Sequence, residues 1–383
     1  MFNRTRFRPR FRGGLSASPS LALDFLSGAL DPRFTFTRAS AGWDFNSAGD
    51  LAQYATNVPR FGFDQSTLAA RGLLMEGART NIALWSRDFT NAAWVKTNTT
   101  TALDVTGIDG AANTASRLTA TAAGGTALQT ITSASANHVT SFFVRRVLGS
   151  GTVEITQDNG ATWTAIAVTP AWQRFAIPTA TITNPVIGFR LGTNGDVIAV
   201  DAAQTEVEAF PTSPILTTSA IVTRAVDTAT MTPVTPWCNA TEGTMVAEFL
   251  FPYAPTFSGS VVAQDLFRLD DGASTNYASI RMVRQSAVVL YCDCIVVAGG
   301  VSVFDGPNSS FSANQVCKLA LAYKSGDYGT SFNGGAVTTG AGASVPSGIN
   351  RLLMGGANGG AYIRRVSYYP TRLSNATLQA LTA

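Results

Sequence analysis

The chain has 383 residues, enough for two or three domains of ordinary size. Charged residues make up 13% of it, against about 25% in average soluble proteins, which disfavours surface helices held by ion pairs and favours threonine-rich strands and glycine turns. No run of about 18 apolar residues occurs, so no membrane insertion is predicted, and the basic start lacks the apolar core of a secretory signal. The composition predicts an all-β protein.

Residues 1–20 are predicted to form a basic anchoring arm. The net charge is +3, yet the first twelve residues alone carry five arginines, so the rest of the chain is nearly neutral. Alternate residues of an extended chain share a face, so these arginines form a one-sided basic strip. We expect this strip to bind an acidic groove of a partner protein, with nucleic acid as a second target, and a solvated N-terminus is the alternative. The arginines are Arg4, Arg6, Arg8, Arg10 and Arg12.

Residues 21–81 are predicted to form a hairpin and an irregular ribbon. Residues 21–25 are typical of a short strand, and alternating apolar pieces at 34–37 and 51–55, cut by turn residues, suit a β-hairpin. We interpret Glu76 and Arg79 in the following ribbon as structural residues that clamp it internally. Because so much of the segment is irregular, we expect it to wrap the next domain or to pair with copies of itself in an oligomer.

A resemblance to a known family rests on this segment. The phrases FTRAS, NVPRF and GLLMEGARTN, followed by Ser86, Phe89 and Trp94, resemble a module of bacteriophage virion proteins, the head-fibre (head-spike) and tail-fibre components. The resemblance implies a virion protein that is made in the host cytoplasm and bound to a capsid, connector or tail protein through its arm. It also implies a homo-oligomer, commonly a trimer, although no coiled-coil heptad is present to enforce three chains.

Residues 82–213 are predicted to form an antiparallel jelly roll that resembles a carbohydrate-binding module. Strand candidates separated by glycine-rich turns favour this fold. A D-x-x-Q-x-E run formed by Asp201, Gln204 and Glu206 resembles the last strand of such jelly rolls. Residues 156–163 resemble an Asp-box, in which we expect Asp158 to fix a turn. The strand candidates are 116–119, 126–131, 138–147, 152–156, 162–168, 172–177, 186–191 and 197–208.

Residues 214–242 are predicted to be a proline-marked linker, and residues 243–383 resemble a concanavalin A/laminin G-like β-sandwich. We expect Ser374 to cap a short helix at 375–381. The four cysteines, Cys238, Cys292, Cys294 and Cys317, are expected to be buried reduced thiols. The strand candidates of the sandwich are 244–251, 265–269, 277–283, 287–292, 316–324, 329–332, 351–354 and 361–369.

No catalytic site is predicted. His138 is the only histidine, and no nucleophile-elbow sequence accompanies it. Asp270 and Asp271 would point to opposite faces of a strand, so together they do not form a glycosidase carboxylate pair. Carboxylates that lie far apart in the sequence can still form such a pair, which keeps a capsule depolymerase open as an alternative.

The sequence predicts adhesion to host cell-surface glycans. Sugar sites combine an aromatic platform with polar side chains or a bound Ca²⁺ ion, and the resemblance allows a Ca²⁺ site in either sandwich. Core packing is the alternative for each tryptophan, and a purely structural head-decoration or tail component without glycan binding is the alternative function. The glycan-binding candidates are Trp163 and Trp172 in the jelly roll and Asp270, Asp271, Asn276, Tyr277 and Arg281 at one edge of the last sandwich.

Overall fold

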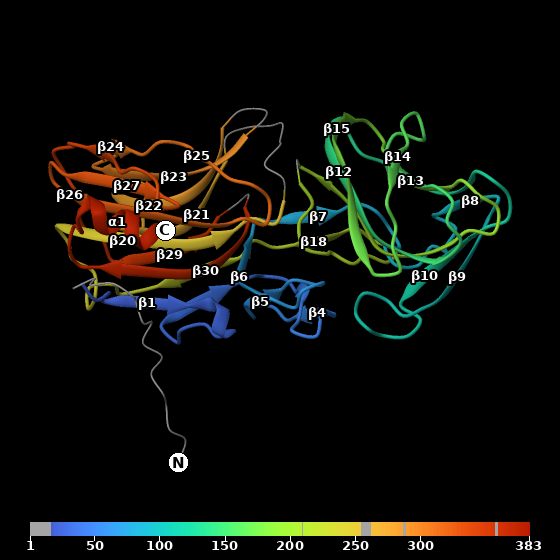
Figure 1. Ribbon diagram of the computed structural model, residues 1–383, viewed down its shortest axis with the longest axis horizontal. Coiled ribbons are helices and arrows are strands. Elements are labelled where there is room, and N and C mark those ends of the chain that lie inside the picture. Colours follow the sequence, from blue (N-terminus) through green and yellow to red (C-terminus); the bar gives the residue numbers. More distant parts are fainter. Residues whose placement is uncertain (1–16, 209, 254–261, 286–288, 357–358) are drawn as a thin grey trace, which may run out of the picture.

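The computed structural model describes residues 17–208, 210–253, 262–285, 289–356 and 359–383 (Figure 1). The predicted arginine strip from Arg4 to Arg12 lies outside the described residues. The prediction of an all-β fold is confirmed, because the described chain consists of antiparallel strands, short turns and one α-helix, α1 (Asn375–Thr382). The Ser374 hydroxyl accepts a hydrogen bond from the Thr377 backbone N–H at 3.3 Å and caps that helix. No helix in this part of the chain is long and apolar enough to cross a membrane.

Two large sheets, named here sheet A and sheet B, form a sandwich at one end of the molecule (Figure 1). Sheet A has the order β28 (Thr338–Gly340), β27 (Tyr328–Phe332), β26 (Val316–Lys324), β20 (Glu242–Leu250), β30 (Gly360–Tyr369), β6 (Ala70–Glu76) and β5 (Arg60–Phe63), and β1 (Leu21–Asp24) also pairs with β30. Sheet B has the order β2 (Phe34–Thr37), β19 (Thr228–Met231), β29 (Arg351–Gly355), β21 (Val262–Asp270), β22 (Tyr277–Gln285), β23 (Val289–Ala298) and β24 (Val301–Asp305), and β25 (Ser309–Ser310) pairs with β23.

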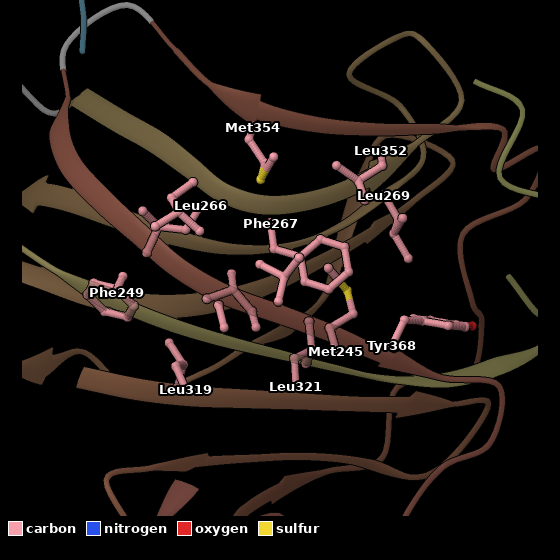
Figure 2. Close-up of a cluster of buried hydrophobic side chains, with 14 of the residues drawn as sticks. Met245, Phe249, Leu266, Phe267, Leu269, Leu319, Leu321, Leu352, Met354 and Tyr368 are labelled. Atoms are coloured by element: carbon pink, nitrogen blue, oxygen red, sulfur yellow. The ribbon is translucent and has the colours of Figure 1, made fainter. Parts of the chain in front are cut away.

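The core of this sandwich is apolar and lies between the two sheets. Figure 2 shows Met245 and Phe249 of β20 and Leu321 of β26 facing Phe267 of β21 and Leu352 of β29. All five side chains are fully buried. Burying side chains of this size contributes about 1.5–3 kcal/mol each relative to leaving them in water, so this core is the main source of stability of the sandwich.

The N-terminal segment belongs to this same sandwich. The sequence division placed residues 21–81 apart from residues 243–383, but β1, β5 and β6 pair within sheet A and β2 pairs with β19 in sheet B. The physical reason is burial: Leu21, Leu23, Phe34 and Phe36 all lie in the sandwich core. Most of the segment thus packs within the last domain, while its hairpin, through Phe45 and Leu51, also contacts the domain that follows it in the sequence.

The hairpin of this segment also differs from the expectation. Strand β2, predicted as one arm of a hairpin, pairs with β19 instead. The observed hairpin joins β3 (Gly42–Phe45) to β4 (Leu51–Tyr54). In its turn the Asn46 backbone N–H donates to the Asp50 carbonyl oxygen at 2.9 Å, and the Asp50 backbone N–H donates to the Asn46 side-chain oxygen at 3.1 Å. The alternation at 34–37 was compatible with either partner, and the burial of Phe34 and Phe36 under β19 decides between them.

The jelly roll packs two five-stranded sheets face to face. The sheet named here the β12 sheet has the order β15 (Gln173–Ile182), β12 (Ala136–Leu148), β17 (Val197–Val207), β10 (Ala115–Ala120) and β9 (Thr99–Val105). The β16 sheet has the order β14 (Thr164–Ile166), β13 (Val153–Thr156), β16 (Val186–Leu191), β11 (Gly125–Thr130) and β8 (Val95–Thr97). Phe89, stacked on Trp94 with ring centroids 3.9 Å apart, and Phe142, 4.5 Å from Phe189, fill the space between them.

The jelly roll is inserted into the sandwich rather than placed before it. The chain leaves the sandwich through β7 (Arg79–Asn81) and returns through β18 (Val222–Arg224), and these two strands pair with each other. Asn81 lies opposite Val222, so the entry and the exit of the inserted domain are direct neighbours. Figure 1 shows this two-stranded neck between the sandwich and the jelly roll.

Candidate functional site

The outer face of the β12 sheet carries Trp172. Its indole is partly exposed and packs on a floor of small apolar side chains that includes Ala115 and Ala199. Arg145 of β12 and Arg117 of β10 pair in register with Ala199 from its two sides, so both arginines flank this floor on the same face. The arrangement is a partly exposed aromatic ring on the outer sheet face, in contact with Arg145 and packed also against the cluster that contains Leu51 and Phe143.

Arg145 is the unusual member of this face. Its guanidinium carbon lies 5.2 Å from the centre of the Trp172 ring, a cation–π contact. Its Nε atom is buried and has no hydrogen-bond partner in the described part of the chain. A guanidinium has five N–H donors and is always charged, and the terminal N–H groups of Arg145, unlike its buried Nε, can be reached by an acceptor on a ligand. Arg117, by contrast, pairs with Asp104 at 2.5 Å.

Trp163 lies apart from Trp172, in the loop before β14 of the other jelly-roll sheet. A Cβ added to Gly160 would lie 2.8 Å from the indole, so Trp163 covers the glycine of its own turn. Arg190 stacks on the ring at 4.6 Å and is held by Glu154 at 2.5 Å. The Trp163 indole is therefore in contact with Gly160 and Arg190 within its own sheet.

Asp158 organises that turn through short hydrogen bonds. Its carboxylate accepts from the Thr162 backbone N–H at 2.9 Å and from the Thr156 hydroxyl at 2.8 Å. Burial alone would raise the pKa of Asp158, but these hydrogen bonds outweigh burial and lower it. The residue is used within the turn, which is the role that the sequence predicts for it.

Four of the five candidates in the last sandwich meet at the turn between β21 and β22. Asp270 is fully buried, and its carboxylate accepts two hydrogen bonds from Arg351, at 2.8 and 2.9 Å, and one from Arg268 at 2.7 Å. The Arg268 guanidinium also covers the ring of Tyr277 at 3.9 Å. β21 and β22 are central in sheet B, so the group lies where these strands end, beside the turn, and not along an outer strand of the sheet.

The remaining candidates of this sandwich are also engaged internally. Asp271 accepts hydrogen bonds from the Ala273 backbone N–H at 2.9 Å and the Asn276 side chain at 3.0 Å. Arg281 lies further along β22 and makes two hydrogen bonds to Asp293, at 2.7 and 2.9 Å. Each charged group on this face of sheet B that we predicted to bind glycan thus has an intramolecular partner.

Glu76 lies in a buried ionic cluster where the neck meets the sandwich. Its carboxylate pairs with Arg60 at 2.9 Å and Arg224 at 3.1 Å, and it accepts two hydrogen bonds from Ser213, at 2.6 and 2.8 Å. Burial alone would raise the pKa of Glu76, but Arg224 and Arg60 outweigh burial and lower the pKa to about 2. Asp227 completes the cluster, pairing with Arg60 at 2.5 Å.

Arg79 does not join this cluster. It lies over the ring of Phe210 at 5.3 Å, and its guanidinium is 3.9 Å from Glu208. Sequence reasoning did not single out Arg224 and Asp227 of the VTRAVD phrase. The available signal was an arginine and an aspartate among small and apolar residues, close to where the jelly roll ends.

Asp44 of β3 lies beside the cluster, and only one of its two carboxylate oxygens has hydrogen-bond partners in the described residues. Its Oδ1 atom accepts from the Tyr362 hydroxyl at 3.0 Å and from the Phe45 backbone N–H at 2.8 Å, while Oδ2 is buried without a hydrogen-bond partner in the described residues. Burial raises the pKa of Asp44 to about 7, although Arg60 acts in the opposite direction. The same hairpin packs on the jelly roll, where Phe45 meets Phe143 with ring centroids 5.7 Å apart.

In the described residues His138 does not belong to a catalytic triad, and no metal site is assembled. His138 is fully buried, and its Nε2 atom lies 2.9 Å from the Ser133 hydroxyl, but in the described part of the chain no carboxylate reaches its Nδ1 atom. No group of three or more His, Cys, Asp or Glu side chains is placed to hold a metal ion there. The four cysteines are free thiols; three are buried and Cys238 is partly buried.

Comparison with known proteins finds similarity among solved structures alone. No family model and no curated protein matches the chain. Similar solved structures include a xylan β-1,4-xylosidase from Bacillus halodurans (8% identity, TM-score 0.25, 39% of this chain and 29% of that one). They also include the N-terminal CBM22-1-CBM22-2 tandem domain of Paenibacillus barcinonensis Xyn10C (9% identity, TM-score 0.27, 77% of this chain and 99% of that one). A third is a mutant of the GH43 protein BlXynB from Bacillus licheniformis (8% identity, TM-score 0.24, 86% of this chain and 74% of that one). Scores of this size do not define a shared fold, and we base no functional inference on them.

Proposed function

We propose that this chain is a carbohydrate-binding adhesion protein and that the outer face of the β12 sheet is its glycan site. The observation that carries the proposal is the pair of Trp172 and Arg145. The indole supplies an apolar surface beside which a sugar ring can pack. The unsatisfied guanidinium supplies donors for a carboxylate or hydroxyl oxygen of the same ligand.

We further propose that the protein is displayed on a bacteriophage particle as a head or tail fibre or spike, in several copies. The described chain begins at Ala17, which packs on the sandwich near α1. An arm that anchors the protein through the segment before Ala17 would therefore hold the sandwich at the base, with the jelly roll at the outer end (Figure 1). Several copies multiply weak contacts, because linked sites bind with an avidity about 10²–10⁴ above that of one site.

The glycan site is tested by binding the whole chain to an array of bacterial surface glycans, with the Trp172→Ala and Trp163→Ala variants in parallel. We expect Trp172→Ala to lose the signal and Trp163→Ala to retain it, because the Trp163 ring is already covered within its turn. Equal signals from both variants would refute the assignment. Absence of any glycan signal from the wild-type chain would favour a purely structural particle component.

Display on a particle has a separate test. Deleting residues 1–14 should leave a folded protein that is missing from purified particles. Deleting only the jelly roll should leave incorporation of the protein into particles intact and should reduce adsorption of the particles to host cells. Reducing-sugar release from host capsule by the purified protein would instead indicate a depolymerase.

A further inference from the structure

We propose that a groove on the outer face of sheet A is a second binding site, for a neutral, hydroxyl-rich ligand of the class of short oligosaccharides. The groove has a volume of about 720 Å³ and lies over β1, β30, β20 and β26. Residues of the 3-10 helix η1 (Phe25–Ser27) and of α1 also line it. It belongs to the sandwich, so it is independent of the site proposed on the jelly roll.

A row of alternating charges crosses the floor of this groove. Asp24 lies opposite Arg365, Arg365 opposite Glu248, and Glu248 opposite Lys318, on four adjacent strands. The Arg365 guanidinium is 3.3 Å from Asp24 and 3.2 Å from Glu248. Glu248 also accepts a hydrogen bond from Arg364 at 2.8 Å, and Lys318 Nζ donates to the Ala383 backbone oxygen, so each charged group of the row already has a partner.

Next to the charged row lies a row of small side chains. Ala22 lies opposite Ser367, and Ser367 opposite Val246. Each is two positions from a member of the charged row, so both rows point to the same face of the sheet. Short side chains beside long ones leave a trough, and the floor of that trough is where a ligand would contact the sheet.

Tyr369 gives an independent sign that the trough accepts a polar ligand. The residue is only 3% exposed and lines the groove, and burial raises its pKa. In the described part of the chain its hydroxyl has no hydrogen-bond partner, and the same holds for the Ser367 hydroxyl beside it. Neither is among the buried polar atoms that lack a partner, so both hydroxyls reach the groove, where a ligand can bond them.

The lining defines the ligand class. A charged ligand would have to displace one member of a balanced ion-pair row, whereas sugar hydroxyls both donate and accept and can bond the row as it stands. Leu26 and Leu381 add aliphatic walls for the C–H faces of a sugar ring. The volume lies within the range of about 300–1,000 Å³ that is usual for small-molecule sites.

The test is ligand-observed saturation-transfer NMR on the full chain with maltotriose and N,N′-diacetylchitobiose, and with 3′-sialyllactose as the charged comparator. Ser367→Trp fills the trough, Tyr369→Phe removes one hydroxyl, and Ser302→Trp places the same bulk on the exposed strand β24 as a control. We expect a neutral probe to bind, with at least tenfold weaker binding in Ser367→Trp, several-fold weaker binding in Tyr369→Phe, and unchanged binding in Ser302→Trp.

Three outcomes would overturn the proposal. The first is that neither neutral probe binds, and the second is that 3′-sialyllactose alone binds. The third is neutral-probe binding that survives Ser367→Trp in a variant that melts like the wild type; if Trp172→Ala removes that binding, the sugar sits on the jelly roll instead. Should Ser367→Trp fail to fold, unchanged affinity in Tyr369→Phe refutes the site.

Discussion

Glu76 accepts two hydrogen bonds from Ser213, one from its hydroxyl at 2.6 Å and one from its backbone N–H at 2.8 Å. Glu76 ends the sandwich strand β6, and Ser213 lies in the segment that leaves the jelly roll. One buried carboxylate therefore joins the two domains at the neck. The cluster around it fixes how the inserted jelly roll is held, and it makes several measurable predictions.

Removing the charge of Glu76 should destabilise the protein strongly. Glu76→Gln leaves Arg60 and Arg224 without one of their buried counter-charges, and breaking a buried ion pair from one side costs about 3–5 kcal/mol. Chemical denaturation should show a loss of about 3 kcal/mol. Asp31→Asn is the matched control, because Asp31 pairs with the exposed Arg33 and its loss should cost less than about 1 kcal/mol. Equal losses in the two variants would contradict this account.

The same carboxylate should make the protein sensitive to acid. The folded pKa of Glu76 is lowered from 4.5 to about 2, so its stabilising contribution is complete above the unfolded pKa and is lost as the pH falls through the folded value. The free energy of unfolding should drop between about pH 4.5 and 2, and this drop should be smaller in Glu76→Gln. Parallel pH profiles for wild type and variant would refute the assignment.

The contribution of Asp44 to the free energy of unfolding should depend on pH in the opposite direction from that of Glu76. Its folded pKa is raised from 3.8 to about 7, so the folded state holds this proton more tightly than the unfolded state. Stability from this group is complete below the unfolded pKa and is lost as the pH rises through the folded value. Asp44→Asn keeps the shape of the side chain without the charge, so its unfolding free energy should fall less than that of the wild type between pH 4 and 8. A variant with an unchanged slope would show that Asp44 is ionised in the fold.

Asp270 should matter for folding and not for glycan binding. Its carboxylate is buried and bonded to Arg268 and Arg351, so Asp270→Asn should lower the unfolding free energy by about 3 kcal/mol. Glycan-array signals of the folded fraction should match those of the wild type. If Asp270→Asn is as stable as the wild type but no longer binds glycan, Asp270 is a ligand-binding residue, as the sequence suggested.

The sequence predicted the fold class well because strand signals are local. The alternating pattern and glycine turns of residues 82–213 gave eight jelly-roll strand candidates, and Ser374 indicated the cap of α1 from its type and position alone. A local sequence pattern does not identify which other strand a given strand pairs with. Phe34 and Phe36 fit any apolar surface, and their pairing with β19 depends on residues almost two hundred positions away.

The candidate site was harder to predict for the same reason. Trp172 was a candidate by residue type, whereas Arg145 became one only when the fold placed it beside that ring without an acceptor. Asp270 and Arg281 looked available in the sequence, but their partners Arg351 and Asp293 come from other strands. A charge is free or engaged according to its neighbours in space, which composition and spacing do not reveal.

The central claim is most directly tested by calorimetric titration of a glycan found on the array into Arg145→Ala and Arg190→Ala. Both arginines stack on a tryptophan of the jelly roll, but Arg190 is already paired with Glu154, whereas Arg145 has no ion-pair partner among the described residues. Loss of a charge-assisted hydrogen bond of about 1.5 kcal/mol or more corresponds to at least about tenfold in Kd. We predict that loss for Arg145→Ala and an unchanged Kd for Arg190→Ala; equal affinities in the two variants would contradict the assignment of the Trp172 face as the glycan site.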